Sequence, residues 1–274
     1  MSSLFCCPVC GGALEINPQS YSCPKEHSFD RASKGYVNLL LSNQKNSREP
    51  GDDADCLRAR RRFLTYGFYA PLAKAIGQAA LDYTPQAPKV LDCCCGEGYY
   101  THFLLDMLQD HDRQPQIAGF DISKHGVKMA ARKNCPTEFA VASAFRIPAP
   151  DNAFDLALLC FAPYCDGELT RVLKPGGVLI RVIPGKAHLY GLKQVLYDHP
   201  YKNDEKSEVP TVLQPVEVRR ISHTIRLTSD QAIDLLAMTP YAYRTDPRSM
   251  HRLHDLPELK TDIEFLIEIF RKPQ

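Results

Sequence analysis

The feature that most constrains this chain is an alternation of short apolar runs with helical segments between residues 88 and 185. Five runs of strand length occur there: KVLDC, QIAGFD, FAVA, FDLALLC and GVLIRVI. Helical segments are expected at 99–109, 124–134 and 166–173, and LKPGGV supplies a sharp turn into the last run. Strands alternating with helices predict an α/β fold with a mostly parallel, doubly wound sheet covered on both faces.

The loop after the first run is rich in glycine. In VLDCCCGEGYYT, Asp92 ends the predicted strand, and Gly96 and Gly98 let the backbone approach a ligand at its carboxyl end. Asp121 ends the second predicted strand, where a carboxylate can accept hydrogen bonds from both hydroxyls of a ribose. NAD enzymes and S-adenosylmethionine (SAM) enzymes share this arrangement. The order Asp-x-x-x-Gly-x-Gly favours SAM.

Three consecutive cysteines, Cys93 to Cys95, raise the alternative of a metal site in the same loop. Successive strand residues point to opposite faces, so three in a row cannot converge on one ion without a bend. We therefore expect Cys93 and Cys95 to be small buried residues.

A second set of cysteines has the spacing of a zinc site. Cys7 and Cys10 are separated by two residues, and twelve residues later Cys23 and His27 are separated by three. Two short loops that bring two ligands each are the usual way to build a tetrahedral, closed, structural zinc site. ALEINPQSYS between them predicts two short strands around an Asn17-Pro18 turn. Cys6 is an alternative to Cys7, but Cys7 fits the two-residue loop better.

Bulk composition indicates where the protein works. The net charge of +1 does not mark the whole chain as a nucleic-acid binder, although a local basic patch is compatible with it. No stretch approaches about 20 apolar residues, so no membrane span is expected. The chain has eleven cysteines, and its N-terminal sequence, MSSLFCCPVC, lacks the features of a signal peptide. Together these features indicate a reducing compartment. We expect a cytoplasmic protein.

The regions outside 88–185 differ from it in pattern. GYVNLLLSNQKNSREPGDD is a polar, turn-rich connector, and residues 54–83 after it have helical periodicity. Residues 203–220 are polar and broken by prolines, which predicts an exposed loop. RRISHTIRLT and TDIEFLIEIFRK predict two late strands that pair antiparallel at the edge of the sheet, and SDQAIDLLAMTP predicts a helix capped by Ser229.

VLDCCCGEGYYT, GFDIS and VLKPGG resemble the motifs of class I methyltransferases. With CPVCGG…CPKEHSFDRASKGYVNLL, SREPGD and RARRRFLTYGFYAPL, they make the chain similar to the bacterial 23S ribosomal RNA guanine-N1 methyltransferases. Few other methyltransferases carry an N-terminal zinc module, so the combination is more specific than the glycine loop alone. The similarity runs from the zinc module to the end of the chain and is weakest over 195–220.

The resemblance implies a Rossmann-like class I methyltransferase fold with a small zinc-ribbon-like module. It divides the chain into a zinc-binding module at 1–35, a connector and helical segment at 36–87, and a SAM-dependent methyltransferase domain at 88–274. It implies an enzyme that transfers a methyl group from SAM to N1 of a guanine in a hairpin of 23S ribosomal RNA. It also implies a homodimer whose paired cleft and zinc modules hold that hairpin.

The family's functional residues carry over by position. Its zinc ligands fall on Cys7, Cys10, Cys23 and His27. Its cofactor contacts fall on Tyr69, Gly96, Glu97 and His188, with Asp121 at the ribose and Asp92 and Gly98 in the same loop. Without the resemblance, Tyr69 is more often a helix-packing aromatic residue and His188 a surface histidine.

Cys94 departs from the family pattern, which has glycine there. If the position needs a positive φ, a non-glycine residue costs about 1 kcal/mol. Its side chain also narrows the space beside the methionine part of the cofactor, so we expect weakened rather than abolished binding.

The loop CFAPYCDGEL lies where class I enzymes place the methyl acceptor. Phe161 or Tyr164 is a candidate to stack on a base removed from its helix, and Asp166 and Glu168 are candidate proton acceptors. A packing aromatic and helix-start acids explain the loop equally well, so no catalytic base is named.

An arginine cluster is the candidate RNA contact. Arg58, Arg61 and Arg62 share a helix face with Arg60 beside them, and Lys45 and Arg48 lie just upstream. A solvated helix face explains the cluster as well.

Two other functions stay open. One is a SAM-dependent methyltransferase of a small molecule, because the central fold hosts both substrate classes. The other is a non-catalytic RNA-binding protein whose cofactor loop has decayed at Cys94.

Overall fold

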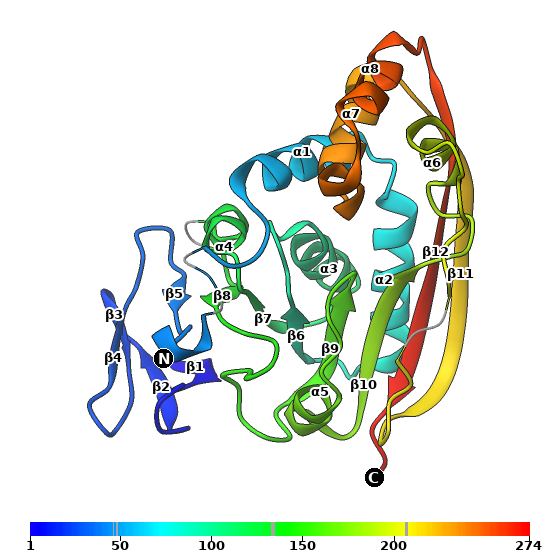
Figure 1. The fold of residues 1–274 in the computed structure, drawn as a ribbon. Coiled ribbons are helices and arrows are strands. Elements are labelled where there is room, and N and C mark those ends of the chain that lie inside the picture. Colours follow the sequence, from blue (N-terminus) through cyan, green and yellow to red (C-terminus); the bar gives the residue numbers. More distant parts are fainter. Residues whose placement is uncertain (46, 48, 133–134, 206–207) are drawn as a thin grey trace.

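The computed structural model describes residues 1–45, 47, 49–132, 135–205 and 208–274. In this part of the chain the strands form a small N-terminal sheet and a large central one (Figure 1). The small sheet has the order β1-β2-β3-β4, with bounds Ser2–Cys6, Ala13–Ile16, Ser20–Ser22 and Ser28–Asp30. Strands β2 and β3 are the two predicted around the Asn17-Pro18 turn. Strands β1 and β4 were not predicted.

The large sheet has the order β11-β12-β10-β9-β6-β7-β8-β5. The five predicted apolar runs are confirmed as β6 Lys89–Cys93, β7 Gln116–Asp121, β8 Glu138–Val141, β9 Phe154–Cys160 and β10 Leu173–Pro184. All of them pair in parallel with their neighbours in that set. The connector adds a strand that was not predicted, β5 Val37–Asn38, which pairs in parallel with β8.

The helices between these strands are α3 Tyr99–Asp110, α4 Lys124–Ala130 and α5 Asp166–Val172. Helix α4 is shorter than the predicted 124–134, and residues 133 and 134 lie outside the described part. None of the helices in the described part is long and apolar enough to cross a membrane.

The single helical segment expected over 54–83 is two helices, α1 Ala54–Thr65 and α2 Ala70–Tyr83. The carboxylate of Asp53 caps α1 by accepting from the N–H groups of Asp55 and Cys56 at 2.9 and 2.8 Å. Gly67 lies between the helices with φ +82°, a conformation that ends a helix. The break places Tyr69 at the start of α2.

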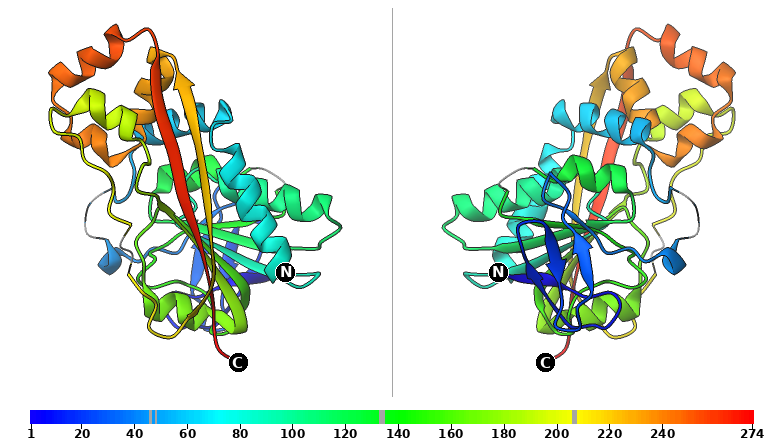
Figure 2. Two further views of the ribbon diagram at one scale, coloured as in Figure 1. Left: turned by 90° about the vertical axis from the view of Figure 1, so that its right-hand side faces the viewer. Right: turned by 90° about the vertical axis from the view of Figure 1, so that its left-hand side faces the viewer.

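The C-terminal region contains α6 Tyr190–Leu196, β11 Gln214–Leu227, α7 Ser229–Ala237, α8 Pro247–Asp255 and β12 Leu259–Arg271, with a short 3₁₀ turn at Pro240–Arg244. Another 3₁₀ turn, at Ser42–Gln44, lies in the connector before α1. The predicted antiparallel pair is confirmed as β11 and β12, two long strands that run up to α7 and α8 (Figure 2). The predicted loop over 203–220 is wrong from Gln214 onward, because β11 starts there. The predicted cap is also wrong: Thr228 rather than Ser229 caps α7, with Gln231 completing a capping box.

Two large apolar clusters lie on the central sheet. One joins strand residues such as Val90, Leu156 and Ile180 to Leu72 of α2 and Leu104 of α3. The other joins Leu91, Phe120 and Leu159 to Leu169 of α5 and to Phe5, Leu14 and Tyr21 of the N-terminal module. The small sheet therefore covers part of the central sheet, and the two share one core.

Candidate functional site

The N-terminal module brings the four predicted metal ligands together. The ligand atoms of Cys7, Cys10, Cys23 and His27 all lie within 4.8 Å of one another. The Sγ atoms of Cys10 and Cys23 are 3.7 Å apart, and Nδ1 of His27 is 3.3 Å from Sγ of Cys23. A tetrahedral zinc with bonds of about 2.3 Å to sulfur separates its ligands by about 3.8 Å. The donor set and its spacing therefore fit zinc.

Cys6 lies outside this group. Its N–H donates to the carbonyl of Pro148 at 2.8 Å, and its side chain is buried. The next residue, Cys7, begins the tight loop, in which the N–H of Gly11 donates to the Cys7 carbonyl at 2.8 Å. Backbone direction thus turns Cys7 toward the metal position and Cys6 toward the central domain.

The glycine loop runs from Cys94 to Gly98, between β6 and α3. Gly98 is the residue before α3 and has φ +85°, where L-residues are strained. A Cβ there would lie 2.8 Å from the Cβ of Ala130, so the loop can pack against α4 only with glycine at this position.

Cys94 has φ +62°, which is the conformation that the family's glycine suits. Strain was predicted at Cys94 if this position needs a positive φ, and the structure shows that it does. The backbone strain is about 1 kcal/mol. Cys93 and Cys95 are buried, as predicted. Cys93 packs in the cluster with Leu91 and Phe120, whereas Cys95 packs in a separate cluster with Phe139. The three thiols belong to different surroundings.

Asp92 is buried at the end of β6, with 2% of its surface exposed. The hydroxyl of Thr101 donates to its Oδ2 at 2.5 Å. Burial, together with the carboxylates of Asp121 and Glu97, raises the pKa of Asp92 to about 7 against the lowering effect of the Thr101 hydrogen bond. A carboxyl held in this way has a strong preference for a cationic partner.

Asp121 reaches from the end of β7 to the same loop. The N–H of Gly96 donates to its Oδ2 at 2.9 Å, and the N–H of Ser123 donates to its Oδ1 at 2.7 Å. Burial raises the pKa of Asp121, and these two hydrogen bonds oppose that effect. Each oxygen has a further lone pair, so the carboxylate can accept two ribose hydroxyls as predicted.

Glu97 is also buried, with 6% of its surface exposed. Burial raises the pKa of its carboxyl, and the positive charge of Arg60 lowers it. The carboxyls of Glu97 and Asp121 thus lie close enough to that of Asp92 to raise its pKa, and such a local excess of acids suits a ligand with positive charge.

Tyr69 and His188 lie against each other. The Tyr69 hydroxyl lies 3.5 Å from Nε2 of His188, and both rings pack on Phe265, with centroids 4.9 and 4.6 Å from it. His188 is buried, so its interpretation as a surface histidine is wrong. Burial lowers the pKa of His188 to about 3, and its Nδ1 accepts from the N–H of Glu264 at 3.3 Å. The neutral ring therefore carries its proton on Nε2, which faces Tyr69.

Comparisons with known proteins agree with both parts of this site. A zinc-ribbon family model described as "RlmA, N-terminal" matches residues 5–48, and one described as "Methyltransferase domain" matches residues 90–177. The 23S rRNA (guanine(748)-N(1))-methyltransferase of Streptomyces fradiae is 32% identical over 92% of this chain and 90% of its own length. The "Putative 23S rRNA (guanine-N(1)-)-methyltransferase YxjB" of Bacillus subtilis is 32% identical over 97% of this chain and 96% of its own length. The chain belongs to this family of rRNA guanine-N1 methyltransferases.

Other proteins are similar over a smaller part of this chain. The demethylmenaquinone methyltransferase of Bacillus licheniformis is 30% identical over 41% of this chain and 52% of its own length. Among solved structures, the YcgJ protein of Bacillus subtilis has a TM-score of 0.47 at 14% identity, over 74% of this chain and 98% of that one. The rRNA methyltransferase family is matched along almost the whole chain.

In this family member, the loop after β9 leaves one aromatic side chain free. Phe161 is 44% exposed, has φ +54°, and packs on Phe265 with ring centroids 5.3 Å apart. Tyr164 is engaged, because its hydroxyl donates to Asp166 at 2.5 Å and the guanidinium of Arg181 lies 4.9 Å from its ring centre. Of the two predicted stacking residues, Phe161 is the one available to a base.

The two candidate proton acceptors hold the loop in place. Burial opposes ionisation of Asp166, but hydrogen bonds from Thr211 and Tyr164 lower its pKa. Burial likewise opposes ionisation of Glu168, whose pKa is lowered by Arg171 and by the N–H of Ile147 at 2.6 Å. Carboxylates with lowered pKa values and full sets of partners are poor proton acceptors.

The arginine cluster divides in two. Arg58, Arg61 and Arg62 line a groove together with Lys34, His125 and Lys128, and the groove lining contains no carboxylate. Arg58 pairs with Asp55, and Arg62 with Asp234, at the rim. Lys45 is exposed, and Arg48 lies outside the described residues.

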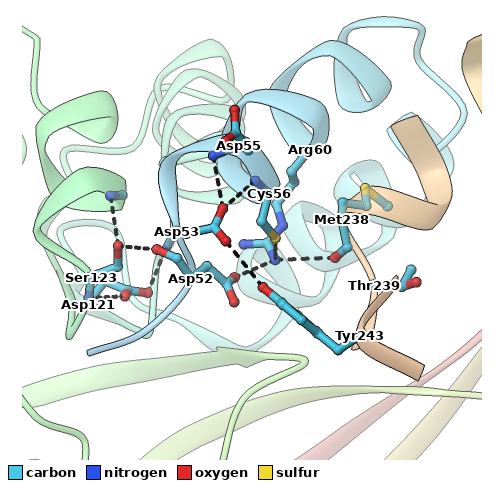
Figure 3. A network of polar contacts seen from close by, with 12 residues as sticks. Asp52, Asp53, Asp55, Cys56, Arg60, Asp121, Ser123, Met238, Thr239 and Tyr243 are labelled. Carbon is cyan, nitrogen blue, oxygen red and sulfur yellow. Dashed lines mark hydrogen bonds and ion pairs between the residues drawn. The ribbon is translucent and has the colours of Figure 1, made fainter. Parts of the chain in front are cut away.

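Arg60 points the other way, toward the glycine loop, which sequence reasoning missed. Helix α1 buries Cys56 and Phe63, and Arg60 lies four residues after the first and three before the second. That spacing puts it on the buried face of the helix and was the available signal. Figure 3 shows the side chain directed toward Asp52, whose carbonyl accepts from Ser123 on the other side.

Proposed function

We propose that this protein transfers a methyl group from S-adenosylmethionine to N1 of a guanine in 23S ribosomal RNA. The proposal depends on one observation: the chain is similar to such enzymes along nearly its whole length, and the same chain forms both a Cys₃His cluster and a glycine loop. A cytoplasmic location follows from that substrate. We divide the chain into a zinc-binding module at 1–35, a connector and helical segment at 36–87, and a methyltransferase domain at 88–274.

The cofactor is held by the residues around the glycine loop. Asp121 would accept the ribose hydroxyls, the backbone from Cys94 to Gly98 would hold the methionine part, and Tyr69 and His188 would complete the site. The carboxyl of Asp92 favours the positive end of the ligand. When bound, the cofactor supplies a methyl group on a positively charged sulfur, so positioning accounts for much of the catalysis.

The acceptor guanine is placed by the loop after β9. Phe161 offers an exposed ring, and its φ of +54° is a strained conformation of the kind that concentrates at functional sites. The ring centroids of Tyr100 and Phe161 are 6.4 Å apart. The hydroxyl of Tyr100 is buried and has no hydrogen-bond partner among the described residues. Stacking on Phe161 and a hydrogen bond with Tyr100 would hold a flipped base against the cofactor.

The groove lined by Lys34, Arg58 and Lys128 is the proposed path of the RNA backbone. It has the positive charge that phosphates require, and Lys34, Arg61 and Lys128 form no ion pair among the described residues. We propose further that the RNA element is a hairpin and that two copies of the chain hold it.

The function is tested by mapping methylated nucleotides, by mass spectrometry, in rRNA from cells lacking the protein and by adding purified protein to that rRNA. Restored methylation of N1 of a guanine supports the proposal. Transfer of labelled methyl groups only to small metabolites, with none to rRNA, would contradict it and favour the small-molecule alternative. Mass measurement with the hairpin bound tests the dimer.

The two substrate contacts have separate tests. F161A should lower kcat for rRNA about 5- to 150-fold because base stacking is worth about 1–3 kcal/mol, while binding of S-adenosylhomocysteine stays unchanged. K128E should raise KM for rRNA without changing kcat, since it affects a phosphate contact. K74E, on an exposed position of α2, is the control for charge reversal.

A further inference from the structure

Arg60 is an arginine enclosed by acids inside the proposed cofactor site. Its side chain is 26% exposed, and its Nη2 donates to Asp52 Oδ2 at 2.6 Å and to the carbonyl of Met238 at 3.4 Å (Figure 3). The segment that carries Asp52 is itself fixed, because the Ser123 hydroxyl donates to the Asp52 carbonyl at 2.7 Å. The guanidinium is therefore held in one place before any ligand arrives.

The rest of the guanidinium has no partner. Every hydrogen bond that Arg60 makes with the described residues comes from Nη2, which leaves the donors on Nη1 and Nε free. Nη1 lies 3.4 Å from the position that a Cβ on Gly96 would take, so these donors face the glycine loop. A largely buried arginine with donors to spare is placed to bind an anion.

The positive charge of Arg60 acts on the predicted cofactor contacts. It opposes the burial effects on the pKa values of Tyr69, Glu97 and Asp121, which come from three different elements around the site. Arg60 is therefore close both to Tyr69 and Glu97, two predicted cofactor contacts, and to Asp121, the predicted ribose contact.

S-adenosylmethionine contains one anionic group, the α-carboxylate, beside its sulfonium and ammonium cations. The acids of the site suit the two cations, and Arg60 is the matching group for the carboxylate. RNA phosphates are a poorer match, because Arg58 and Lys128 face the outer groove whereas Arg60 lies on the buried face of α1.

We propose that Arg60 binds the α-carboxylate of the cofactor through its Nη1 and Nε donors, with Asp52 holding the guanidinium in position. This inference rests on the proposed function, since it requires S-adenosylmethionine as the ligand. It adds a cofactor-binding residue from α1 to those at the glycine loop, and it assigns the segment around Asp52 a role in positioning that residue.

The test compares two ligands that differ only in the carboxylate. S-adenosylhomocysteine and its decarboxylated analogue are titrated by calorimetry into the full-length wild-type protein, R60M, R60K and R58M. R60M should weaken S-adenosylhomocysteine about 10- to 100-fold, as expected for a lost charge-assisted contact, and change the analogue less than about 3-fold. R58M, on the exposed side of the same helix, should change neither.

R60K separates recognition from charge balance. Lysine keeps the positive charge among the acids but not the planar pair of donors, so we expect a loss of about 3- to 10-fold for S-adenosylhomocysteine alone. An equal loss of both ligands in R60M, or wild-type affinity of R60K for both, would overturn the role of Arg60 and leave the proposed function standing. If the wild-type protein binds neither ligand, the proposed function itself fails.

Discussion

Two regions of this protein contain clustered cysteines, and they use them in opposite ways. In the N-terminal module, Cys10 and Cys23 come from separate loops and their sulfurs lie 3.7 Å apart. In the glycine loop, Cys93, Cys94 and Cys95 are neighbours in sequence, yet Cys93 and Cys95 pack in different apolar clusters. Spacing along the chain and the direction of each side chain decide whether thiols form a metal site. Their number does not.

The largest effect is expected from a ligand of the N-terminal cluster. C7S should remove zinc from the protein and, with it, most of the about 10–16 kcal/mol that a structural zinc supplies. The module shares its core with the central sheet through Phe5 and Leu14, so thermal unfolding of the whole chain should shift as well. Zinc content by mass spectrometry and calorimetric unfolding measure both effects.

C6S is the matched control, because Cys6 is the neighbouring buried thiol and lies outside the ligand group. It should keep one zinc per chain. Loss of zinc from C6S with zinc retained in C7S would reverse the ligand assignment.

A smaller but still large effect is expected in the glycine loop. G98A should lower the free energy of unfolding by about 3 kcal/mol, because the residue has φ +85° and an added Cβ would lie 2.8 Å from Ala130. It should also abolish binding of S-adenosylhomocysteine. Gly167 has no atom within 4 Å of its Cβ position, so G167A should leave binding unchanged in calorimetry and raise the unfolding free energy in urea by no more than about 1 kcal/mol.

The buried carboxyl beside the loop predicts a pH dependence. The pKa of Asp92 is raised from 3.8 to about 7, so the folded state holds the proton more tightly than the unfolded state. Its contribution to stability is fully present below about pH 4 and is lost as the pH rises through 7. Between pH 5.5 and 8 the loss is about 2 kcal/mol.

Urea unfolding of wild type and D92N across that range isolates this contribution, since other titrating groups cancel in the difference. The stability of D92N relative to wild type should rise by about 2 kcal/mol from pH 5.5 to 8. A constant difference would mean that Asp92 titrates as an ordinary carboxyl.

The smallest effect is expected at the residue that departs from the family pattern. C94G removes about 1 kcal/mol of backbone strain, and the greater freedom of glycine in the unfolded state offsets part of it. The unfolding free energy should therefore rise by less than about 1 kcal/mol, while S-adenosylhomocysteine binds more tightly. C93G, at the neighbouring position but within the core, should cost about 2 kcal/mol. Equal effects of the two substitutions would remove the distinction between them.

The sequence by itself determined the local parts of this protein. Five strands, their intervening helices and the four metal ligands follow from periodicity and spacing, because each depends on residues within a few positions of one another. The sequence raised a positive φ at position 94 only as a condition, because the family has glycine there, and the structure shows that the condition is met.

Tertiary structure decided what depends on distant segments. The break at Gly67 divides α1 from α2, and Tyr69 then meets His188 although 119 positions separate them. The inward direction of Arg60 depends on Asp52, Met238 and the glycine loop closing around it. Local pattern shows which face of a helix is apolar, but burial of a charged side chain requires partners from elsewhere in the chain, and only the assembled fold supplies them.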